Sequence, residues 1–243
     1  LAEQAALFPR ALRMGEGDFV FGYVGRMNRD KGLDELVAAF QSICDDRSRL
    51  ICVGGYDATA PVSRKTLSAL NADPKITLTG FQKDIRPLLA VMDVLILPSY
   101  REGFPNVLLE AGAMKRPVIA TDVNGSNEIV VPGVTGSLVP PRDPAALAEA
   151  MLSIREMPEG KRNALGGNAR ERVVRHFDRH HVRSELLLFY TQALQERNRA
   201  TVQSVHGTER QLCRAETNFR FRPVILRRDH SPCPCSSFFW LAV

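Results

Sequence analysis

The sequence predicts an α/β fold in which a doubly wound parallel sheet is covered by helices on both faces. Short apolar runs alternate with longer amphipathic segments, and most of these runs end at Gly or Pro. This alternation favours parallel strands joined by right-handed helical crossovers. Such crossovers bring the carboxyl ends of all strands to one edge of the sheet, where ligands bind in open α/β folds.

Buried strands are predicted where short runs of apolar residues are bounded by turn residues. Phe19–Val24, for example, is followed directly by Gly25, and a Gly-Gly pair follows the second run. The predicted strands are residues 19–24, 50–53, 76–79, 94–97, 118–121 and 137–139.

Helices are predicted between these strands because apolar residues recur there at helical spacing. In the first such segment, Leu33, Leu36, Val37, Phe40 and Ile43 share one face. The predicted helices are residues 33–43, 61–70, 85–91, 106–114 and 145–154, with two further helices within residues 160–198.

The chain therefore divides into four segments. We expect residues 1–17 to be a linker or the remnant of a missing N-terminal domain, and residues 18–158 to form the α/β domain. Residues 159–198 are the C-terminal helices. In residues 199–243, Arg, Pro and aromatic residues mix without periodicity, so we expect a disordered or non-native tail.

Composition excludes several classes of protein. The net charge is +5, and much of it comes from arginines after residue 200, so we expect no nucleic-acid partner. No apolar run approaches the roughly 20 residues that span a bilayer. Cys44 and Cys52 are expected to be buried thiols, and the chain has no disulfide framework. A reducing, cytoplasmic compartment is therefore predicted.

A metal site is not predicted. No Asp-x-Asp occurs in the chain, so no carboxylate pair for a divalent cation on a diphosphate is evident. His230, Cys233 and Cys235 lie close together in the tail, but Cys-x-Cys lacks the usual zinc spacing.

The loop after the first predicted strand carries candidate anion-binding residues. Gly25 permits close approach of the backbone to a ligand. Arg26 and Lys31 place two cations just past the strand, beside the start of a helix. Arginine suits bidentate phosphate contact, and lysine acts as a point charge. Taken alone, this loop is more typical of a solvated basic turn that caps a helix.

Two carboxylates follow the fourth predicted strand. Glu102 and Glu110 are eight positions apart, and Pro105 between them fits only the first turn of a helix. Glu102 is thus predicted in a loop and Glu110 about one turn inside the helix. Carboxylates accept hydrogen bonds from paired hydroxyls, which suits a sugar or a ribose. As alternatives, Glu110 is an exposed helix residue and Glu102 a partner of the helix dipole.

An ordered set of motifs gives this pattern a family resemblance. The set is Gly25-Arg26 with Lys31-Gly32, Gly54-Gly55, Gly80-Phe81, Pro98-Ser99, Glu102-Gly103-Phe104-Pro105 with Glu110, residues 117–121, and Gly133-x-x-Gly136. Over about residues 18–198 it resembles the donor-binding half of retaining nucleotide-sugar glycosyltransferases of family 4 (glycosyl transferases group 1). Their GT-B fold consists of two Rossmann-like domains, and many act in polysaccharide biosynthesis.

The resemblance implies a role for each matched residue. Arg26 and Lys31 would hold the diphosphate and stabilise the leaving group, and Glu102 would contact hydroxyls of the transferred sugar; these three are the catalytic candidates. Glu110 would contact the ribose. The remaining candidate donor-binding residues are Gly25, Gly80, Phe81, Gly103, Phe104, Pro105, Asn106 and Val107. No metal or other cofactor is implied.

In the family, the acceptor site lies on a separate N-terminal domain, which residues 1–17 cannot supply. A glycan or lipid-linked acceptor would bind there, and peripheral association of the full-length protein with the inner face of the membrane stays open. We expect this chain alone to have little or no transferase activity. Two alternatives remain: a sugar-nucleotide epimerase or hydrolase of the same architecture, and a nucleotide-binding module without turnover.

Overall fold

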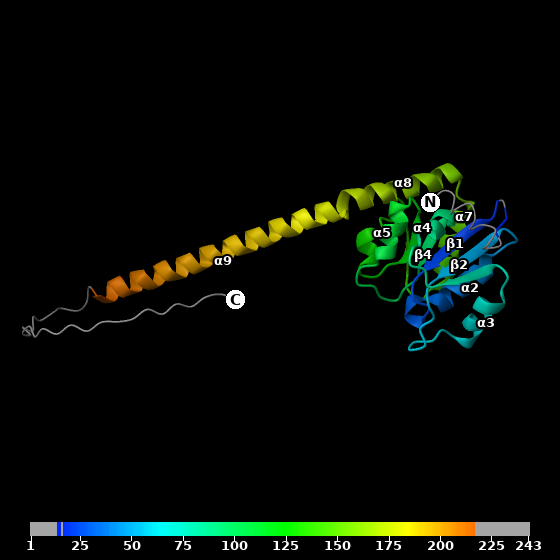
Figure 1. The fold of residues 1–243 in the computed structure, drawn as a ribbon, viewed down its shortest axis with the longest axis horizontal. Coiled ribbons are helices and arrows are strands. Elements are labelled where there is room, and N and C mark those ends of the chain that lie inside the picture. The colour runs from blue at the N-terminus through cyan, green and yellow to red at the C-terminus, as the bar shows by residue number, and fades with distance from the viewer. Residues whose placement is uncertain (1–13, 16, 217–243) are drawn as a thin grey trace, which may run out of the picture. The chain divides into compact units, whose positions relative to one another are not determined.

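The computed structural model describes residues 14, 15 and 17–216, with side chains up to Arg197 (Figure 1). The chain divides into two compact units, Leu1–Glu185 and Leu186–Val243. The first contains the α/β body. The helix α9 (Arg179–Glu216) begins in the first unit and supplies the described part of the second.

The α/β body is built on a six-stranded sheet with the order β3-β2-β1-β4-β5-β6, and every neighbouring pair is parallel. This confirms the predicted fold class. The strands are β1 (Phe19–Val24), β2 (Ser48–Val53), β3 (Ile76–Gly80), β4 (Val94–Leu97), β5 (Val118–Thr121) and β6 (Gly136–Val139).

Helices connect the strands and cover both faces of the sheet (Figure 1). They are η1 (Arg29–Lys31), α2 (Leu33–Ile43), α3 (Arg64–Ala72), α4 (Arg86–Val91), α5 (Asn106–Ala113), α6 (Ser126–Ile129), α7 (Pro144–Glu156) and α8 (Glu159–His176). Two short helices were not predicted: the single 3-10 turn η1 and the four-residue α6. Both are too short to show a helical period.

Alternation along the strands builds two cores. Phe21 and Tyr23 of β1 pack with Phe40 of α2 on one face, where α7 also contributes apolar side chains. Val20 of β1 points to the other face and packs with residues of α4 and α5, including Leu89. Successive side chains of a strand point to opposite faces, so one strand serves both cores. Burying each large apolar side chain contributes about 1.5–3 kcal/mol.

The C-terminal helices differ in their packing. Gly112 of α5 faces α8, and a Cβ on it would lie 3.3 Å from the carbonyl oxygen of Ala169, so α8 packs closely on the body. The helix α9 continues to Glu216, past residue 198, where we expected the helical part to end. The other proposed domain boundaries stay predictions. Residues 1–13, 16 and 217–243, with His230, Cys233 and Cys235, lie outside the described residues.

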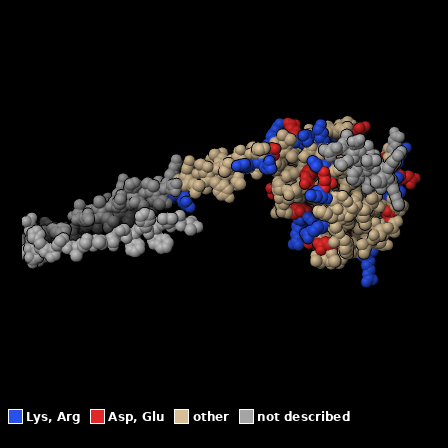
Figure 2. Space-filling view, in the orientation of Figure 1, with Lys and Arg blue, Asp and Glu red and all other residues tan. Residues whose placement is uncertain are grey.

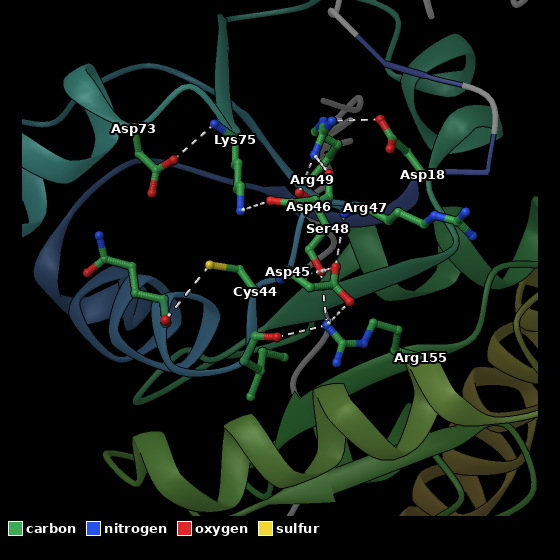
Figure 3. A network of polar contacts seen from close by, with 12 residues as sticks. Asp18, Cys44, Asp45, Asp46, Arg47, Ser48, Arg49, Asp73, Lys75 and Arg155 are labelled. Carbon is green, nitrogen blue, oxygen red and sulfur yellow. Dashed lines mark hydrogen bonds and ion pairs between the residues drawn. The ribbon is translucent and has the colours of Figure 1, made fainter.

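A polar network closes the edge of the sheet where strands β1 and β2 begin (Figure 3). Arg155 of α7 donates to the carbonyl of Ile43 at 2.8 Å and to the hydroxyl of Ser48 at 3.0 Å. Its guanidinium also lies 3.4 Å from the carboxylate of Asp45. Arg155 therefore ties α7 to the turn that leads from α2 into β2.

The two described cysteines differ in burial. Cys52 of β2 is buried as expected, and burial raises the pKa of its thiol to about 12. Cys44 was also expected to be buried, but it is only half-buried at the end of α2. It follows the last helical residue, Ile43, and its thiol donates to the carbonyl of Gln41 at 3.8 Å.

Candidate functional site

The carboxyl ends of β1, β2 and β3 meet in close backbone contact. The amide of Gly25 donates to the carbonyl of Val53 at 2.9 Å, and the amide of Gly54 donates to that of Gly80 at 2.9 Å. Gly54 has φ of 141°, and a Cβ there would lie 1.9 Å from the carbonyl oxygen of Gly25. Only glycine fits such a position. The predicted gathering of strand-end glycines at one edge is confirmed.

Lys31 and Glu102 form an ion pair across this edge. The Nζ atom of Lys31 lies 2.6 Å from Oε1 of Glu102, and the two side chains are 20% and 10% exposed. Lys31 ends η1 after β1, whereas Glu102 lies in the loop after β4. The pair therefore brings together two candidates that are 71 positions apart in the sequence.

The backbone holds these two loops against each other. The amide of Tyr100 donates to the carbonyl of Asp30 at 2.9 Å. Gly32 adopts φ of 67°, and a Cβ on it would lie 2.0 Å from the carbonyl oxygen of Pro98. Asn28 is the N-cap of η1, and its side-chain oxygen accepts a hydrogen bond from the amide of Lys31 at 3.1 Å. Lys31 is thus positioned by a helix cap as well as by its ion pair.

Arg26 lies on the same loop and is more exposed. Its side chain is 71% exposed and contacts Asp57 at 3.1 Å. The backbone of Arg26 is held in place because the hydroxyl of the buried Tyr23 donates to the Arg26 carbonyl at 2.6 Å. Hydrogen bonds from Thr59 and Asn28, together with the charge of Arg26, lower the pKa of Asp57 to about 2. Asp57 is therefore a carboxylate at physiological pH.

A pocket of about 390 Å³ opens beside Arg26. It is lined by Val24, Gly25, Arg26, Val53, Gly54, Gly55, Phe81, Gln82, Lys83, Ile85 and Glu110. Phe81 is 81% exposed, so its ring is available to a planar group. Partial burial raises the pKa of Glu110. The pocket therefore unites two cations (Arg26 and Lys83), an aromatic ring and a carboxylate from two loops and one helix.

Residues 103–107 form the entry into α5. Pro105 is the residue before the first helical residue, Asn106, so Glu110 lies just over one turn inside the helix, as predicted. A Cβ on Gly125 would lie 2.3 Å from the carbonyl oxygen of Gly103, which fixes this turn against the loop after β5. The amide of Leu108 donates to the carbonyl of Pro105 at 3.0 Å. The first two amides of α5, those of Asn106 and Val107, have no carbonyl partner within the helix and can face an anion.

The structure groups the predicted site residues in three sets. Gly25, Arg26, Phe81 and Glu110 line the pocket, whereas Lys31 and Glu102 contact each other and are not among its lining residues. Residues 103–107 and Gly80 flank these two sets. The sets share one edge of the sheet because Arg26 and Lys31 belong to the same short loop.

Sequence reasoning missed several residues of the site. Gly54 and Gly55 were recognised as the end of a strand but not as pocket residues, although a glycine pair there is a usable signal. Gln82 and Lys83 follow Phe81 directly. Asp57 has no signal in the sequence, because its role depends on a contact with a loop 31 positions earlier.

Metal-ligating side chains do not cluster in the described part of the chain, where no three His, Cys, Asp or Glu residues gather as metal ligands would. The expectation that no metal is required stays a prediction. Among the described helices, none has the length and apolar composition needed to cross a bilayer.

Fold and site together define the class of protein. The strand order 3-2-1-4-5-6 is that of Rossmann-like domains, and it reverses between β1 and β4. Ligands of such sheets bind in the crevice at this switch point. Arg26 and Lys31 follow β1 and Glu102 follows β4, so the three catalytic candidates flank the switch point. The α/β body is therefore a Rossmann-like domain with a charged candidate site at this switch point.

Comparison with known proteins identifies the family. Residues 18–156 match the family model described as glycosyl transferases group 1. A capsular polysaccharide biosynthesis glycosyltransferase of Staphylococcus aureus, CapM, is 34% identical over 181 residues, covering 74% of this chain and 47% of CapM. The chain belongs to the group 1 glycosyltransferases and spans about half the length of the curated relatives it matches.

Solved structures agree with this assignment. Sucrose-phosphate synthase of Thermosynechococcus elongatus superimposes with a TM-score of 0.67 at 31% identity, over 80% of this chain and 49% of that one. HepE of Anabaena, solved with UDP and glucose, gives a TM-score of 0.70 at 23% identity, over 78% and 52%. The fold is thus one Rossmann-like half of a GT-B glycosyltransferase.

Proposed function

We propose that this chain binds a nucleoside-diphosphate sugar as the donor half of a retaining, metal-independent glycosyltransferase. The observation that carries the proposal is the Lys31–Glu102 pair at the switch point. Lys31 lies on the loop that also supplies Arg26 to the pocket, and Glu102 lies on the loop after β4. One chemical class matches this arrangement: a diphosphate for the cations, sugar hydroxyls for Glu102, and a nucleoside for the pocket.

Each end of the donor has a partner in the proposal. The base lies near Gly80 and Phe81, and Glu110 accepts hydrogen bonds from the ribose. Arg26 and Lys31 neutralise the diphosphate, assisted by the amides at the start of α5. Glu102 binds hydroxyls of the sugar, with Gly103 to Val107 beside it. UDP and glucose in HepE are consistent with this class of donor.

Catalysis follows from charge stabilisation at the leaving group. The bond between the anomeric carbon and the diphosphate oxygen breaks, and its electron pair stays on the diphosphate. Arg26 and Lys31 stabilise this developing charge, which is commonly the largest catalytic contribution. The acceptor hydroxyl attacks from the same face, gives its proton to the departing diphosphate and forms the new glycosidic bond with retention.

The acceptor is proposed to bind to a second domain of a longer protein. A glycan or a lipid-linked acceptor fits relatives such as CapM, whose name places it in capsular polysaccharide biosynthesis. A cytoplasmic location, with peripheral association at the inner membrane face, is part of the same proposal. On the face drawn in Figure 2, Lys and Arg lie interspersed with Asp and Glu over the body, and we propose no nucleic-acid partner.

Calorimetry with UDP, ADP and GDP tests the donor site directly. We expect one of these nucleotides to bind the 243-residue chain in EDTA, and Lys31→Ala to weaken binding by roughly a hundredfold. Glu110→Ala should weaken it less, because a neutral ribose is involved. Lys65→Ala, on the outer helix α3, is the matched control. No binding to the wild-type chain, or binding unchanged by both site variants, would overturn the proposal.

Product analysis separates transfer from the alternatives. A longer protein that includes the upstream coding sequence, incubated with the nucleotide sugar alone and then with candidate acceptors, should form a glycoside only in the second case. An epimerised or hydrolysed sugar from the first incubation would show that the protein is an epimerase or a hydrolase and not a transferase. Nucleotide binding without any turnover in either incubation would show that the protein is a nucleotide-binding module.

A further inference from the structure

Asp57, in the loop after β2, contacts Arg26 directly and is linked to the backbone of Lys31 through Asn28. Asp57 lies outside the family motifs, and both of its carboxylate oxygens are engaged. Its Oδ2 atom accepts hydrogen bonds from Arg26 at 3.1 Å and from Asn28 at 3.0 Å. Its Oδ1 atom accepts from the amide of Thr59 at 3.0 Å and from the Thr59 hydroxyl at 2.6 Å.

Asn28 carries the connection from Asp57 to Lys31. The Asn28 side chain is a buried polar group that is only 4% exposed. Its amide nitrogen donates to Asp57, which orients its oxygen to accept from the amide of Lys31. Asp57 thereby contacts the guanidinium of Arg26 directly and fixes the cap that positions Lys31.

The backbone makes this loop a fixed platform. The amide of Met27 donates to the carbonyl of Gly55 at 2.8 Å, and the amide of Asp57 donates back to the carbonyl of Met27 at 3.1 Å. The amide of Arg29 donates to the carbonyl of Ala60 at 2.9 Å. The two loops are thus paired along their length, and Asp57 is held independently of the Arg26 side chain.

Asp57 is well placed to act on an exposed arginine. The Asp57 side chain is only 14% exposed, whereas that of Arg26 is largely in solvent. An arginine loses substantial rotamer entropy when it is fixed, and a partner that holds it beforehand removes part of that loss from binding. The negative charge of Asp57 also balances one cation while the site is empty.

We propose that Asp57 is a positioning residue that preorganises Arg26 and Lys31 as a two-cation clamp for the diphosphate. This inference rests on the proposed function, because it assumes that the two cations bind a diphosphate. It adds a residue that the family motifs do not contain. The effect of Asp57 should depend on the phosphates of the ligand and not on its nucleoside.

The test compares ligands on variants of the full 243-residue chain. Calorimetry is done with the preferred nucleoside diphosphate and, by competition, with the matching nucleoside. Asp57→Ala should weaken diphosphate binding about tenfold, the range of a charge-assisted hydrogen bond, and change nucleoside binding less than about twofold. Asp57→Asn keeps one acceptor oxygen and should recover part of the loss. The readout that a purely structural role would not give is the unchanged nucleoside affinity, because a distorted pocket would weaken both ligands.

A matched control comes from the opposite edge of the sheet. Asp46 pairs with Lys75 at 3.5 Å in the network of Figure 3, and Asp46→Ala should leave both affinities unchanged. If Asp57→Ala fails to fold, the comparison is made with Asp57→Asn, whose expected loss is about threefold.

The outcomes separate this inference from the proposed function. Diphosphate binding that is unchanged by Asp57→Ala and Asp57→Asn but lost in Lys31→Ala overturns the clamp and leaves the donor site standing. An equal loss for nucleoside and diphosphate also overturns it, because Asp57 would then shape the whole pocket. No diphosphate binding by the wild-type chain overturns both.

Discussion

The two edges of the sheet use the same kinds of side chain in different ways. At the edge where β1 and β2 begin, Arg155 donates to the carbonyl of Ile43 and the hydroxyl of Ser48, and it also lies 3.4 Å from the carboxylate of Asp45. At the carboxyl edge, Lys31 and Arg26 contact carboxylates, and Arg26 lines a pocket. The first edge satisfies the chain's own polar groups, whereas the second holds charge next to an open volume.

This difference has an energetic meaning. A cation that bonds to buried backbone carbonyls contributes to stability, because those carbonyls would otherwise lose their hydrogen bonds. A cation paired with a carboxylate beside a pocket can exchange that partner for a phosphate. Changes at the amino edge should therefore lower stability alone, and changes at the carboxyl edge should alter binding.

The largest effect is expected from Gly54→Ala. Its φ of 141° is strained for any residue with a side chain, and the new Cβ would collide with the carbonyl of Gly25. We expect a loss of more than about 3 kcal/mol in the free energy of unfolding, and loss of nucleotide binding. Urea denaturation and calorimetry measure the two quantities.

Gly55→Ala is the matched control for this substitution. No atom lies within 4 Å of a Cβ at Gly55, so Ala there should leave the free energy of unfolding near its wild-type value; Gly55 also lines the pocket, so this control applies to stability and not to binding. Equal effects of the two substitutions would contradict the claim that the close contact between the β1 and β2 loops shapes the pocket.

The next effect is expected from Arg155→Ala at the amino edge. The substitution removes the donor for the carbonyl of Ile43 and the hydroxyl of Ser48, so the free energy of unfolding should fall by about 1–3 kcal/mol. Nucleotide affinity, measured where the variant is folded, should stay unchanged. Arg47→Ala is the control, because the Arg47 side chain points away from this network in Figure 3. Weakened nucleotide binding in Arg155→Ala would erase the contrast between the edges.

Much of the contrast between the edges follows from the sequence. Alternating apolar runs predicted the sheet, and the strand-end glycines predicted which loops meet. Arg26, Lys31, Glu102 and Glu110 were all identified from loop position and residue type. Their positions along the chain determine which edge they reach once the strands are parallel.

The sequence could not supply the pairings. That Lys31 contacts Glu102 depends on how two loops fold against each other, and the same holds for Asp57 with Arg26. The length of the last helix was also underestimated, since α9 continues to Glu216 through a segment without apolar periodicity. Helix length there is not determined by an amphipathic pattern.

A smaller effect is expected from Glu102→Gln. This substitution keeps the shape of the side chain but removes the negative charge that holds Lys31. The diphosphate then has a weaker competitor for Lys31, so nucleoside-diphosphate affinity should rise about three- to tenfold. Affinity for the complete nucleotide sugar should rise less, because Glu102 is also proposed to bind the sugar.

Glu149→Gln is the control for Glu102→Gln, because Glu149 is exposed on α7. Comparing the two ligands in each variant isolates the role of the Lys31–Glu102 pair. A lower nucleoside-diphosphate affinity in Glu102→Gln would show that the pair orients Lys31 and does not compete with the phosphate.

The smallest effect concerns the pH dependence of binding through Glu110. Partial burial raises the pKa of this carboxyl, so it takes up a proton at a higher pH than an exposed glutamate does. Its ionised form accepts hydrogen bonds from ribose hydroxyls better than the neutral acid. Nucleoside affinity should therefore fall a fewfold as pH is lowered from about 7 to about 4.5. Because the pKa of Glu110 is raised, this fall should begin at a higher pH than it would for an exposed glutamate.

Using the nucleoside avoids the terminal phosphate, whose second ionisation lies near pH 6. The Glu110→Gln side chain cannot titrate, so the nucleoside affinity of this variant should be lower at neutral pH and should not change across the range.

The stability of the wild type should change with pH in the opposite sense to its nucleoside affinity. A raised native pKa means that the folded state binds more protons than the unfolded state, so Glu110 lowers stability as pH rises through this range. A pH profile of affinity that is the same in wild type and Glu110→Gln would remove Glu110 from the ribose site, while the cation edge around Lys31 would be unaffected.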